Sequence, residues 1–343
     1  MTTDDPGAPS RRATLREVAA AAGVATSTVS RSLRDDPQIS QRTRDAIKRI
    51  AAEFQYIPNA SARTLAGSSS RMLGLVVPDV TDPVHGQIVH GFEAAARRHG
   101  YTVIVASSGY DAAQELVALH AFTANQVEGM ASFGGTLSSA ALQSQPIGNI
   151  VFMNPENLDE AGPGAERGLI TFDDAGGMEE AVRTAVSMGN RRLGFLVGPP
   201  RASGYRRQAT VLRVAAELGL PPVRLIEGAD AHPDAAGRRI RRERLDVVLC
   251  YDDQRALVLL DALRKADIKV PDDVGVIGFD DIPQAAISNP RLTTVSVPHA
   301  DVGMLAAEDL IEGRSGLLPV STRFSARLVV RESLGRGSQD ELR

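Results

Sequence analysis

Between residues 73 and 279 the chain alternates short β-rich apolar runs with segments of helical character, and this alternation constrains the fold more than any other feature. Strands that alternate with helices form parallel βαβ units. The runs are LGLVV (73–77), TVIVAS (102–107), GMASF (129–133), NIVFM (149–153), GLITF (168–172), RLGFLV (192–197), DVVLCY (246–251) and VGVIGF (274–279). We therefore expect an α/β core. With 343 residues, two or three domains are expected.

Carboxylates and an asparagine follow the ends of several of these runs. Parallel sheets bind ligands beyond the carboxyl ends of their strands, so these residues are candidates to line a pocket. Their oxygens can accept hydrogen bonds from a polyhydroxylated ligand such as a sugar. The alternative is that many of them cap the helices that follow. The residues are Asp79, Asp82, Asn154, Asp173, Asp174, Asp252, Asp253, Asp280 and Asp281.

Ahead of the core, the sequence from residue 14 onward predicts three short helices. Thr14 and Glu17 form a capping box at the start of the first helix, and Gly23 is placed to end it in a left-handed conformation. The second helix turns Val29 and Leu33 inward. Its outward side chains are hydrogen-bond donors that can contact base edges in a DNA groove and phosphates. They are Thr26, Ser27, Thr28, Ser30 and Arg31. Two helices joined by a glycine-containing turn, with the second polar outward, form the helix-turn-helix pattern.

The charge distribution favours DNA binding by this module. Ser40 is a plausible N-cap for the third helix, which carries an apolar stripe beneath basic side chains. Residues 11–71 contain eleven Lys or Arg against five Asp or Glu, whereas the whole chain has a net charge of −4. Any small three-helix domain with a solvated charged face is the alternative. Basic charge concentrated in one module of an acidic chain is what attraction to phosphates requires.

The order of these motifs resembles the lactose/galactose repressor (LacI/GalR) family of bacterial transcription regulators. The resemblance rests on TLREVAAAAGVATSTVSR from residue 14, PNASARTLA from residue 58 and LGLVVPD from residue 73. Later motifs agree, with VEG at 127–129, RRLGF at 191–195, VGVIGFDD at 274–281 and PRLTTV at 290–295. The family fold is an α-helical N-terminal helix-turn-helix domain followed by a periplasmic-binding-protein-like α/β core. That core has two parallel-sheet subdomains with an effector cleft between them.

The resemblance also implies domain borders. We expect a flexible tail at 1–13, the helix-turn-helix domain at 14–58, a hinge helix and linker at 59–71, an effector-binding and dimerisation core at 72–335 and a tail at 336–343. Within the core we expect an N-subdomain of about 72–169 and 296–322 and a C-subdomain of about 170–295 and 323–335. Crossovers then lie near 169, 296 and 323.

For DNA binding, the family implies contacts from the recognition helix and from a hinge helix in the minor groove, where Leu65 wedges a base step open. The segment 59–66 is short enough to be unstable alone, so a flexible linker is the alternative. Ala25 replaces a common serine before the recognition helix, which removes one potential cap or phosphate contact. The expected DNA-binding residues are Thr14, Thr26, Ser27, Thr28, Ser30, Arg31, Asn59, Arg63, Leu65 and Ala66.

For the effector, the resemblance favours Asp252 and Asp280 as pocket residues and leaves Asp253 and Asp281 as helix caps. Arg207 matches the effector-binding arginine, with Arg206 as the alternative register. An aromatic residue often found after Asp82-Pro83 is missing, and His85 could replace it. The expected effector-binding residues are Asp82, His85, Phe133, Asn154, Phe172, Ser203, Arg207, Asp252 and Asp280.

Three functions remain open: a ligand-responsive repressor, a sugar-transport protein with the same core, and a hydrolase acting in the cleft. A transport protein has no use for residues 14–66, and no P-loop, GxSxG or HExxH motif supports an enzyme. We expect no cofactor, no metal and no membrane association. We expect a cytoplasmic, nucleoid-associated homodimer that binds double-stranded operator DNA and a small effector, a sugar or related metabolite. No signal peptide is apparent, and the single cysteine, Cys250, fits a reducing compartment.

Overall fold

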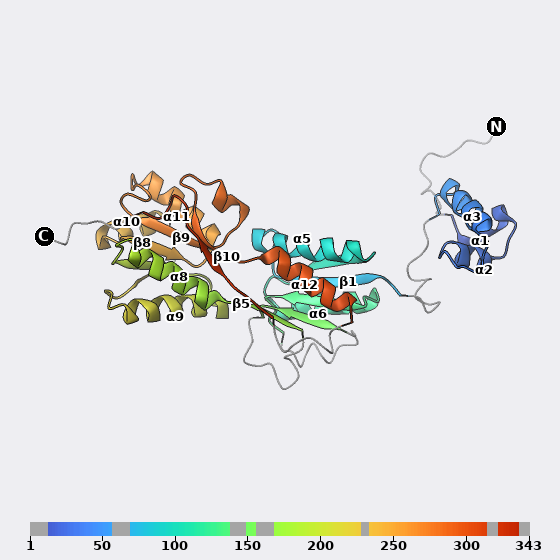
Figure 1. The fold of residues 1–343 in the computed structure, drawn as a ribbon, viewed down its shortest axis with the longest axis horizontal. Coiled ribbons are helices and arrows are strands. Elements are labelled where there is room, and N and C mark those ends of the chain that lie inside the picture. Colours follow the sequence, from blue (N-terminus) through green and yellow to red (C-terminus); the bar gives the residue numbers. More distant parts are fainter. Residues whose placement is uncertain are drawn as a thin grey trace. The chain divides into compact units, whose positions relative to one another are not determined.

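The computed structural model describes residues 13–56, 69–137, 149–155, 168–227, 233–313 and 322–335. Its internal contacts divide the chain into two compact units, Met1–Ser70 and Arg71–Arg343 (Figure 1). The predicted hinge residues 59–66 lie outside the described residues, so the hinge helix stays a prediction. The predicted borders of the tails, the hinge and the helix-turn-helix domain likewise stay predictions.

The first unit contains α1 (Leu15–Ala22), α2 (Thr26–Ser32) and α3 (Gln41–Glu53). The predicted capping box is confirmed, because the Thr14 hydroxyl accepts from the Glu17 N–H and the Glu17 carboxylate accepts from the Thr14 N–H. Gly23 ends α1 with φ 66°, and the side chain of Ser40 caps α3. Apolar side chains from all three helices form one small core, made by Val18, Ala19, Val29, Ile47 and Ala51.

The second unit holds two sheets. The first has the order β11-β5-β4-β3-β1-β2 and is parallel throughout. The second has the order β12-β10-β9-β8-β6-β7 and is parallel except for β12, which runs antiparallel to β10. The first sheet comprises β1 (Met72–Val77), β2 (Thr102–Ser107), β3 (Gly129–Phe133), β4 (Ile150–Met153), β5 (Leu169–Phe172) and β11 (Thr322–Phe324). The second comprises β6 (Leu193–Leu196), β7 (Arg224–Ile226), β8 (Val247–Cys250), β9 (Gly275–Asp280), β10 (Thr293–Ser296) and β12 (Arg327–Val329).

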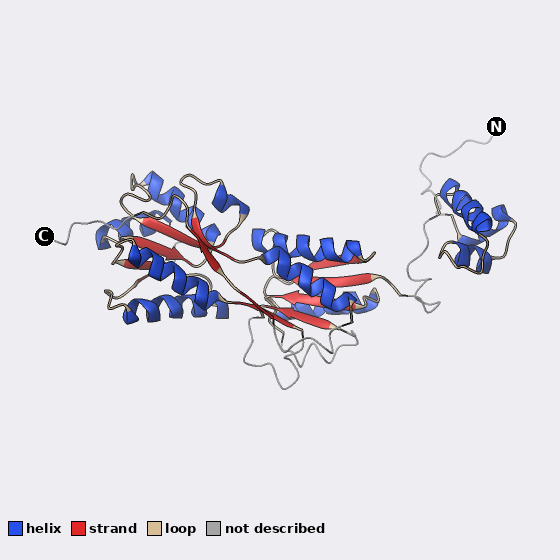
Figure 2. Cartoon of the chain, viewed as in Figure 1, coloured by secondary structure: helices blue, strands red, loops and turns tan. Residues whose placement is uncertain are grey.

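Helices cover both faces of each sheet (Figure 2). The first sheet is covered by α5 (Pro83–Arg98), α6 (Ala112–Ala124) and α12 (His299–Ile311). The second is covered by α8 (Asp174–Ser187), α9 (Ala202–Glu217), α10 (Pro233–Glu243) and α11 (Asp253–Lys265), with a 3₁₀ turn, η2, at Pro283–Ala286. The expected α/β core of parallel sheets is therefore confirmed.

The chain passes between the two sheets three times in the described residues. It leaves the first sheet after β5, returns after β10 through α12, and leaves again between β11 and β12. The first crossover follows Phe172, three residues after the position near 169 that the resemblance implies, because β5 pairs with β4 and β11 in the first sheet. The third follows Phe324, one residue after the position near 323 that the resemblance implies. The second lies between the end of β10 at Ser296 and the start of α12 at His299.

Helices α5 and α12 approach unusually closely. A Cβ atom on Gly91 would lie 1.9 Å from the backbone oxygen of Ala300, and one on Gly303 would lie 2.1 Å from that of Ile88. No side chain fits at either position, so the two glycines let the helix backbones touch. The helix that follows the second crossover is thereby fixed to the first sheet.

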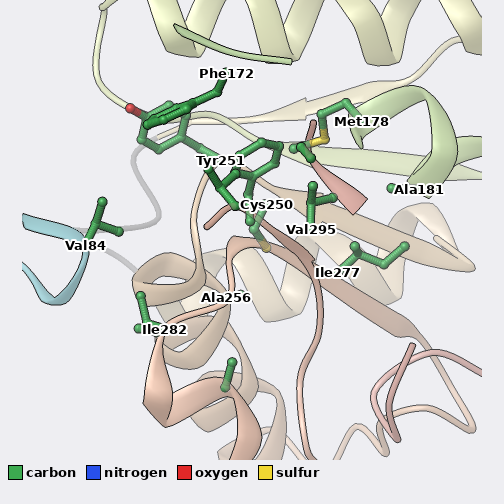
Figure 3. Close-up of a cluster of buried hydrophobic side chains, with 14 of the residues drawn as sticks. Val84, Phe172, Met178, Ala181, Cys250, Tyr251, Ala256, Ile277, Ile282 and Val295 are labelled. Atoms are coloured by element: carbon green, nitrogen blue, oxygen red, sulfur yellow. The ribbon is translucent and has the colours of Figure 1, made fainter. Parts of the chain in front are cut away.

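A continuous apolar core extends through the second unit, and side chains from both sheets contribute to it. Phe172 and Tyr251 belong to the same buried cluster as Cys250, Ile277 and Val295 (Figure 3). Among the described residues, no helix combines the length and the apolar character that a membrane crossing requires.

Candidate effector pocket and DNA-binding surface

In the first unit, α2 presents the polar face that the sequence predicts. Thr26 and Ser27 are exposed, while Thr28 and Ser30 are partly exposed and Val29 is buried. Ala25 occupies the N-cap position, and no side-chain hydrogen bond caps α2 there. The face therefore offers hydroxyl groups that water, phosphate or base edges can reach.

Arg31 is less free than the sequence suggested. Its Nε donates to Asp36 Oδ2 at 2.8 Å, and its Nη2 donates to the Gln38 side chain. Nearby, Lys48 Nζ lies 2.5 Å from Asp35 Oδ1. These hydrogen bonds and charges lower the pKa of both Asp35 and Asp36 below the usual value. Part of the basic charge of this unit is thus already paired, and the predicted contact of Arg31 with DNA would require it to share or exchange these partners.

Thr14 caps α1 and hydrogen-bonds to Glu17, which gives it a structural task in addition to the predicted DNA contact. Asn59, Arg63, Leu65 and Ala66 lie outside the described residues. Their predicted contacts, like those of α2, stay predictions.

In the second unit, one pocket of about 290 Å³ is formed where strands of both sheets end. All nine residues predicted to bind an effector line it: Asp82, His85, Phe133, Asn154, Phe172, Ser203, Arg207, Asp252 and Asp280. Phe133, Phe172 and Asp280 end strands, as expected for a ligand site in parallel sheets. Asp82, Asn154 and Asp252 lie in the turns that follow strands. The other three are carried by helices, His85 by α5 and Ser203 and Arg207 by α9. The structure therefore brings these residues together, while their contact with an effector stays a prediction.

A buried ion-pair cluster centres on Arg207, which α9 carries into the pocket. Arg207 Nη2 lies 3.3 Å from Asp174 Oδ1 and 3.5 Å from Asp280 Oδ1. Its Nη1 donates to the Tyr251 carbonyl at 2.7 Å, and its guanidinium lies 3.6 Å from the centre of the Phe279 ring. Only 5% of the Arg207 side chain is exposed, against 36% for Arg206. Arg207, not Arg206, is therefore the pocket arginine.

The electrostatics of this cluster favour its charged form. Burial alone would lower the pKa of Arg207, but the carboxylates of Asp174 and Asp280 raise it overall. Burial alone would raise the pKa of Asp280, but Arg207 and His299 lower it below the usual value overall. The pair is consequently charged at neutral pH.

The two carboxylates after β8 have different roles. Asp252 caps α11 by accepting from the Arg255 N–H at 2.8 Å, and it also lines the pocket, so the capping and pocket interpretations both apply. Burial raises its pKa even though Arg255 acts in the opposite direction. Asp253 is not the cap that we predicted. It is buried and accepts from the Ile282 N–H and the Thr294 hydroxyl, and burial raises its pKa to about 8.

The other predicted cap is also wrong, while a further strand-end aspartate does cap a helix. Asp281 pairs with Arg331 at 2.6 Å instead of capping a helix, because η2 begins only after Ile282. Asp173 caps α8 by accepting from the Gly176 N–H. These outcomes show that adjacent carboxylates at a strand end separate into different environments.

Aromatic rings line the side of the pocket that the first sheet contributes. The His85 ring meets Phe133 edge-on at 5.3 Å between centroids, and Phe133 lies 6.1 Å from Phe172. His85 is buried, and its Nδ1 lies 2.6 Å from the Asp79 carbonyl oxygen. His85 therefore occupies the wall where an aromatic residue was missing from the sequence pattern.

Two side-chain contacts span the pocket from one sheet to the other. The Gln254 side-chain amide on α11 donates to Asp82 Oδ2, at the start of α5, at 3.1 Å. The Arg201 guanidinium, just before α9, lies 3.1 Å from the centre of the Tyr110 ring, which follows β2. Because both contacts join the two subdomains directly, they favour one relative placement of the sheets.

Strained backbone gathers around the pocket. Tyr110, Asn154 and Asp280 have φ values of 61°, 44° and 106°. Residues other than glycine seldom adopt these conformations, and such strain persists where the surrounding structure holds it, often at ligand sites.

The pocket residues that sequence reasoning missed include Tyr110, Arg201, Tyr251 and His299. The Tyr251 hydroxyl lies 3.0 Å from the Ser203 hydroxyl. Tyr251 directly precedes Asp252, so its place at a strand end was the available signal. Among the described residues, no group of three or more His, Cys, Asp or Glu could hold a metal ion.

Comparison with known families supports both units. Residues 14–59 match the family described as bacterial regulatory proteins, lacI family, and residues 182–334 match the periplasmic binding protein-like domain. The chain is 30% identical over 315 residues to the HTH-type transcriptional repressor CytR of Escherichia coli K12, which covers 88% of this chain and 91% of CytR. It is also 32% identical over 307 residues to the ribose operon repressor of Bacillus subtilis, over 87% of this chain and 91% of that protein.

Solved structures share the fold. The lac repressor dimer bound to operator and the anti-inducer ONPF matches with a TM-score of 0.81 at 23% identity, covering 95% of this chain and 100% of that chain. A complex of the transcriptional regulator CelR with cellobiose matches with a TM-score of 0.65 at 26% identity, covering 94% and 100%. On its sequence relatives and their shared domain order, the chain belongs to the lacI family of bacterial regulatory proteins and is a helix-turn-helix transcriptional regulator, not an enzyme.

Proposed function

We propose that the protein is a repressor that binds a palindromic operator as a homodimer and is controlled by a small sugar or related polyhydroxy metabolite. The observation that carries this proposal is the pocket, in which charged hydrogen-bonding groups from one subdomain face an aromatic wall from the other. A sugar ring has the matching properties, with hydroxyl groups at its edge and an apolar face. The protein would act in the cytoplasm, on the nucleoid.

The size of the pocket supports a small effector. Ligand pockets commonly have volumes of roughly 300–1,000 Å³, and this one, at about 290 Å³, lies at the lower end. One ring therefore suits it better than an oligosaccharide. Two similar structures contain sugars, cellobiose in CelR and D-xylulofuranose in a regulator from Alkaliphilus metalliredigens.

The charges of the pocket argue against an anionic effector. Arg207 already faces two carboxylates, Asp174 and Asp280, and Arg255 pairs with Asp252. A phosphate or carboxylate group beside these aspartates would meet like charge. An uncharged polyol meets no such repulsion.

For operator binding, Thr26, Ser27 and Arg31 would contact base edges in successive major grooves, and Leu65 would enter the minor groove between them. The lac repressor was solved as a dimer on its operator, which supports the same arrangement here. We place the domains as the sequence predicts, with the hinge at 59–71 between the DNA-binding domain and the core.

Effector binding would control the operator through the placement of the two subdomains. The pocket lies between them, so a ligand that binds one placement more tightly shifts the equilibrium. A preference of ~100-fold corresponds to about 2.7 kcal/mol, which is within the usual range of coupling free energies. The hinge helices would pair in only one of the two placements.

The effector part of the proposal is tested by a thermal-shift screen of sugars and nucleosides, followed by operator gel shifts with and without each hit. We expect at least one uncharged polyol to raise the melting temperature and to change operator affinity. Asp280→Ala should lose both responses and keep basal operator binding. A screen in which sugar phosphates stabilise the protein and uncharged sugars do not would contradict the proposal.

The operator part is tested by fluorescence anisotropy with a selected operator. Ser27→Ala and Leu65→Ala should each weaken binding, because one loses a groove contact and the other the minor-groove wedge. Ser187→Ala, an exposed serine at the end of α8, is the matched control and should bind as the unmodified protein does. Unchanged affinity in Leu65→Ala would count against the hinge arrangement.

A further inference from the structure

His299 is the first residue of α12, directly after the chain crosses from the second sheet to the first. Its side chain is 1% exposed and lines the pocket. Its ring meets Phe172 edge-on, with 5.3 Å between the ring centroids. Neither ring nitrogen makes a hydrogen bond to any described residue. A buried imidazole that lacks such partners is costly, so its polar atoms call for an explanation.

The nearest polar groups converge on one oxygen atom. His299 Nε2 lies 3.5 Å from Asp280 Oδ1, and Arg207 Nη2 lies 3.5 Å from the same oxygen. Both distances exceed the 2.7–3.2 Å of a well-formed hydrogen bond. Arg207 Nε also has no hydrogen-bond partner among the described residues. His299 and Arg207 thus both carry nitrogens without a hydrogen-bond partner among the described residues, and both lie beside the Asp280 carboxylate in the lining of the pocket.

We infer that His299 is a specificity-determining residue that reads a hydroxyl group of the effector. This inference rests on the proposed function and goes beyond it by naming the reader and the group. A hydroxyl both donates and accepts, so it can donate to Asp280 while it accepts from His299 or Arg207. An anionic group cannot donate to the Asp280 carboxylate. The ligand class is therefore an uncharged polyol with at least one hydroxyl at this position.

The position of His299 also explains how such a contact acts across the pocket. Asp280 and Arg207 belong to the second subdomain, at the end of β9 and on α9. His299 belongs to α12, which packs against α5 so closely that Gly303 admits no side chain. A hydroxyl held between Asp280 and His299 consequently joins both subdomains and favours the placement that brings them together.

The test measures binding affinities by calorimetry on the full-length protein, with changes made both in the ligand and at residue 299. The probes are D-ribose, D-xylose, D-glucose, D-galactose, myo-inositol and cytidine, and each probe that binds is compared with its monodeoxy analogues. His299→Phe keeps the ring against Phe172 and removes both nitrogens, while His299→Gln keeps a donor and an acceptor. His120→Phe, at an exposed position on α6, is the control.

We expect His299→Phe to weaken binding of the parent polyol about tenfold to hundredfold, the usual effect of leaving a buried hydroxyl unpaired. The deoxy analogue that lacks the hydroxyl contacted by His299 should bind the unmodified protein with a similar loss of affinity. The unmodified protein and His299→Phe should bind this analogue with equal affinity. His299→Gln should lose less than His299→Phe, and His120→Phe should lose nothing.

Equal affinity of His299→Phe and the unmodified protein for the parent polyol would overturn the inference. The inference would also be overturned if His299→Phe lost the same affinity for every deoxy analogue as for the parent polyol, because that pattern indicates a general structural effect. If His299→Phe does not fold, the same cycle with His299→Gln decides between these outcomes. If no probe binds the unmodified protein, the proposed function fails and the inference fails with it, whereas binding without the His299 coupling overturns the inference alone.

Discussion

Replacing Arg207 by alanine tests the buried ion-pair cluster most severely. Arg207 is 5% exposed and faces Asp174 and Asp280, which are themselves buried. Removing the guanidinium leaves both carboxylates without their central cation. Breaking a buried pair in this way costs about 3–5 kcal/mol, because an uncompensated charge stays inside the protein.

This free energy converts into a measurable shift of the melting temperature. A loss of 1 kcal/mol lowers the melting temperature of a domain of 150–250 residues by roughly 2–4 °C. We therefore expect Arg207→Ala to melt about 6–20 °C below the unmodified protein in calorimetry at pH 7.5. Arg213→Ala is the matched control on the same helix, since Arg213 pairs with Glu179 and Glu217 at the solvent-exposed surface, where ion pairs contribute little to stability.

The effect should depend on pH in a defined direction. In the unmodified protein the pKa of Asp280 lies below its usual value, so its stabilising contribution is present above that value and is lost as the pH falls. In Arg207→Ala burial dominates and raises this pKa, so the variant loses stability as the pH rises through the raised value. The difference in melting temperature between the two proteins should therefore be smaller at pH 5 than at pH 8.

A partial rescue should follow from removing one of the stranded charges. Asp280→Asn in the Arg207→Ala background should recover part of the lost stability, because the two residues share one ion-pair network. A melting temperature for Arg207→Ala within 2 °C of the unmodified protein, as for a ~1 kcal/mol change, would refute this reasoning. A difference in melting temperature that stays the same between pH 5 and pH 8 would refute the electrostatic explanation.

Three further predictions concern other parts of the core. Gly303→Ala should lower the melting temperature and separate α12 from α5, seen as faster amide exchange in both helices, because its Cβ would meet the Ile88 carbonyl at 2.1 Å. Asp253→Asn should become more stable relative to the unmodified protein as the pH rises from 5 to 8, measured by urea unfolding. The raised Asp253 pKa of about 8 means that ionisation of this carboxyl over that pH range destabilises the folded state. Tyr110→Leu should lose the Arg201 contact, worth ~0.5–2 kcal/mol, and bind the effector more weakly, while Tyr110→Phe should bind nearly as before; equal losses would exclude a role for the ring face.

Much of the core could be predicted from the sequence because its strands are continuous apolar runs. All eight predicted runs form strands whose ends lie within one residue of the expected positions. The pocket could be predicted as well, since the carboxyl ends of parallel strands meet at one edge. The capping box at Thr14 could also be predicted, because it depends only on residues three positions apart.

The remaining features depend on contacts between distant segments. Strands β7, β11 and β12 are only three residues long, too short for a periodic pattern to stand out. The choice between Asp252 and Asp253 depends on whether α11 turns a side chain toward the pocket or toward Thr294. His299 enters the pocket only because a crossover places α12 beside the first sheet.

In the proposed function, a basic helix-turn-helix unit binds a specific duplex and an effector in the core changes this binding. Selecting genomic fragments with the purified protein at moderate salt, and titrating the best fragment with and without the stabilising polyol, measures both properties. We predict a preference of roughly 10³-fold or more over random fragments and a shift of this affinity when the polyol is added. Equal binding of selected and random fragments, or a selected fragment whose affinity no pocket ligand alters, would contradict the claim.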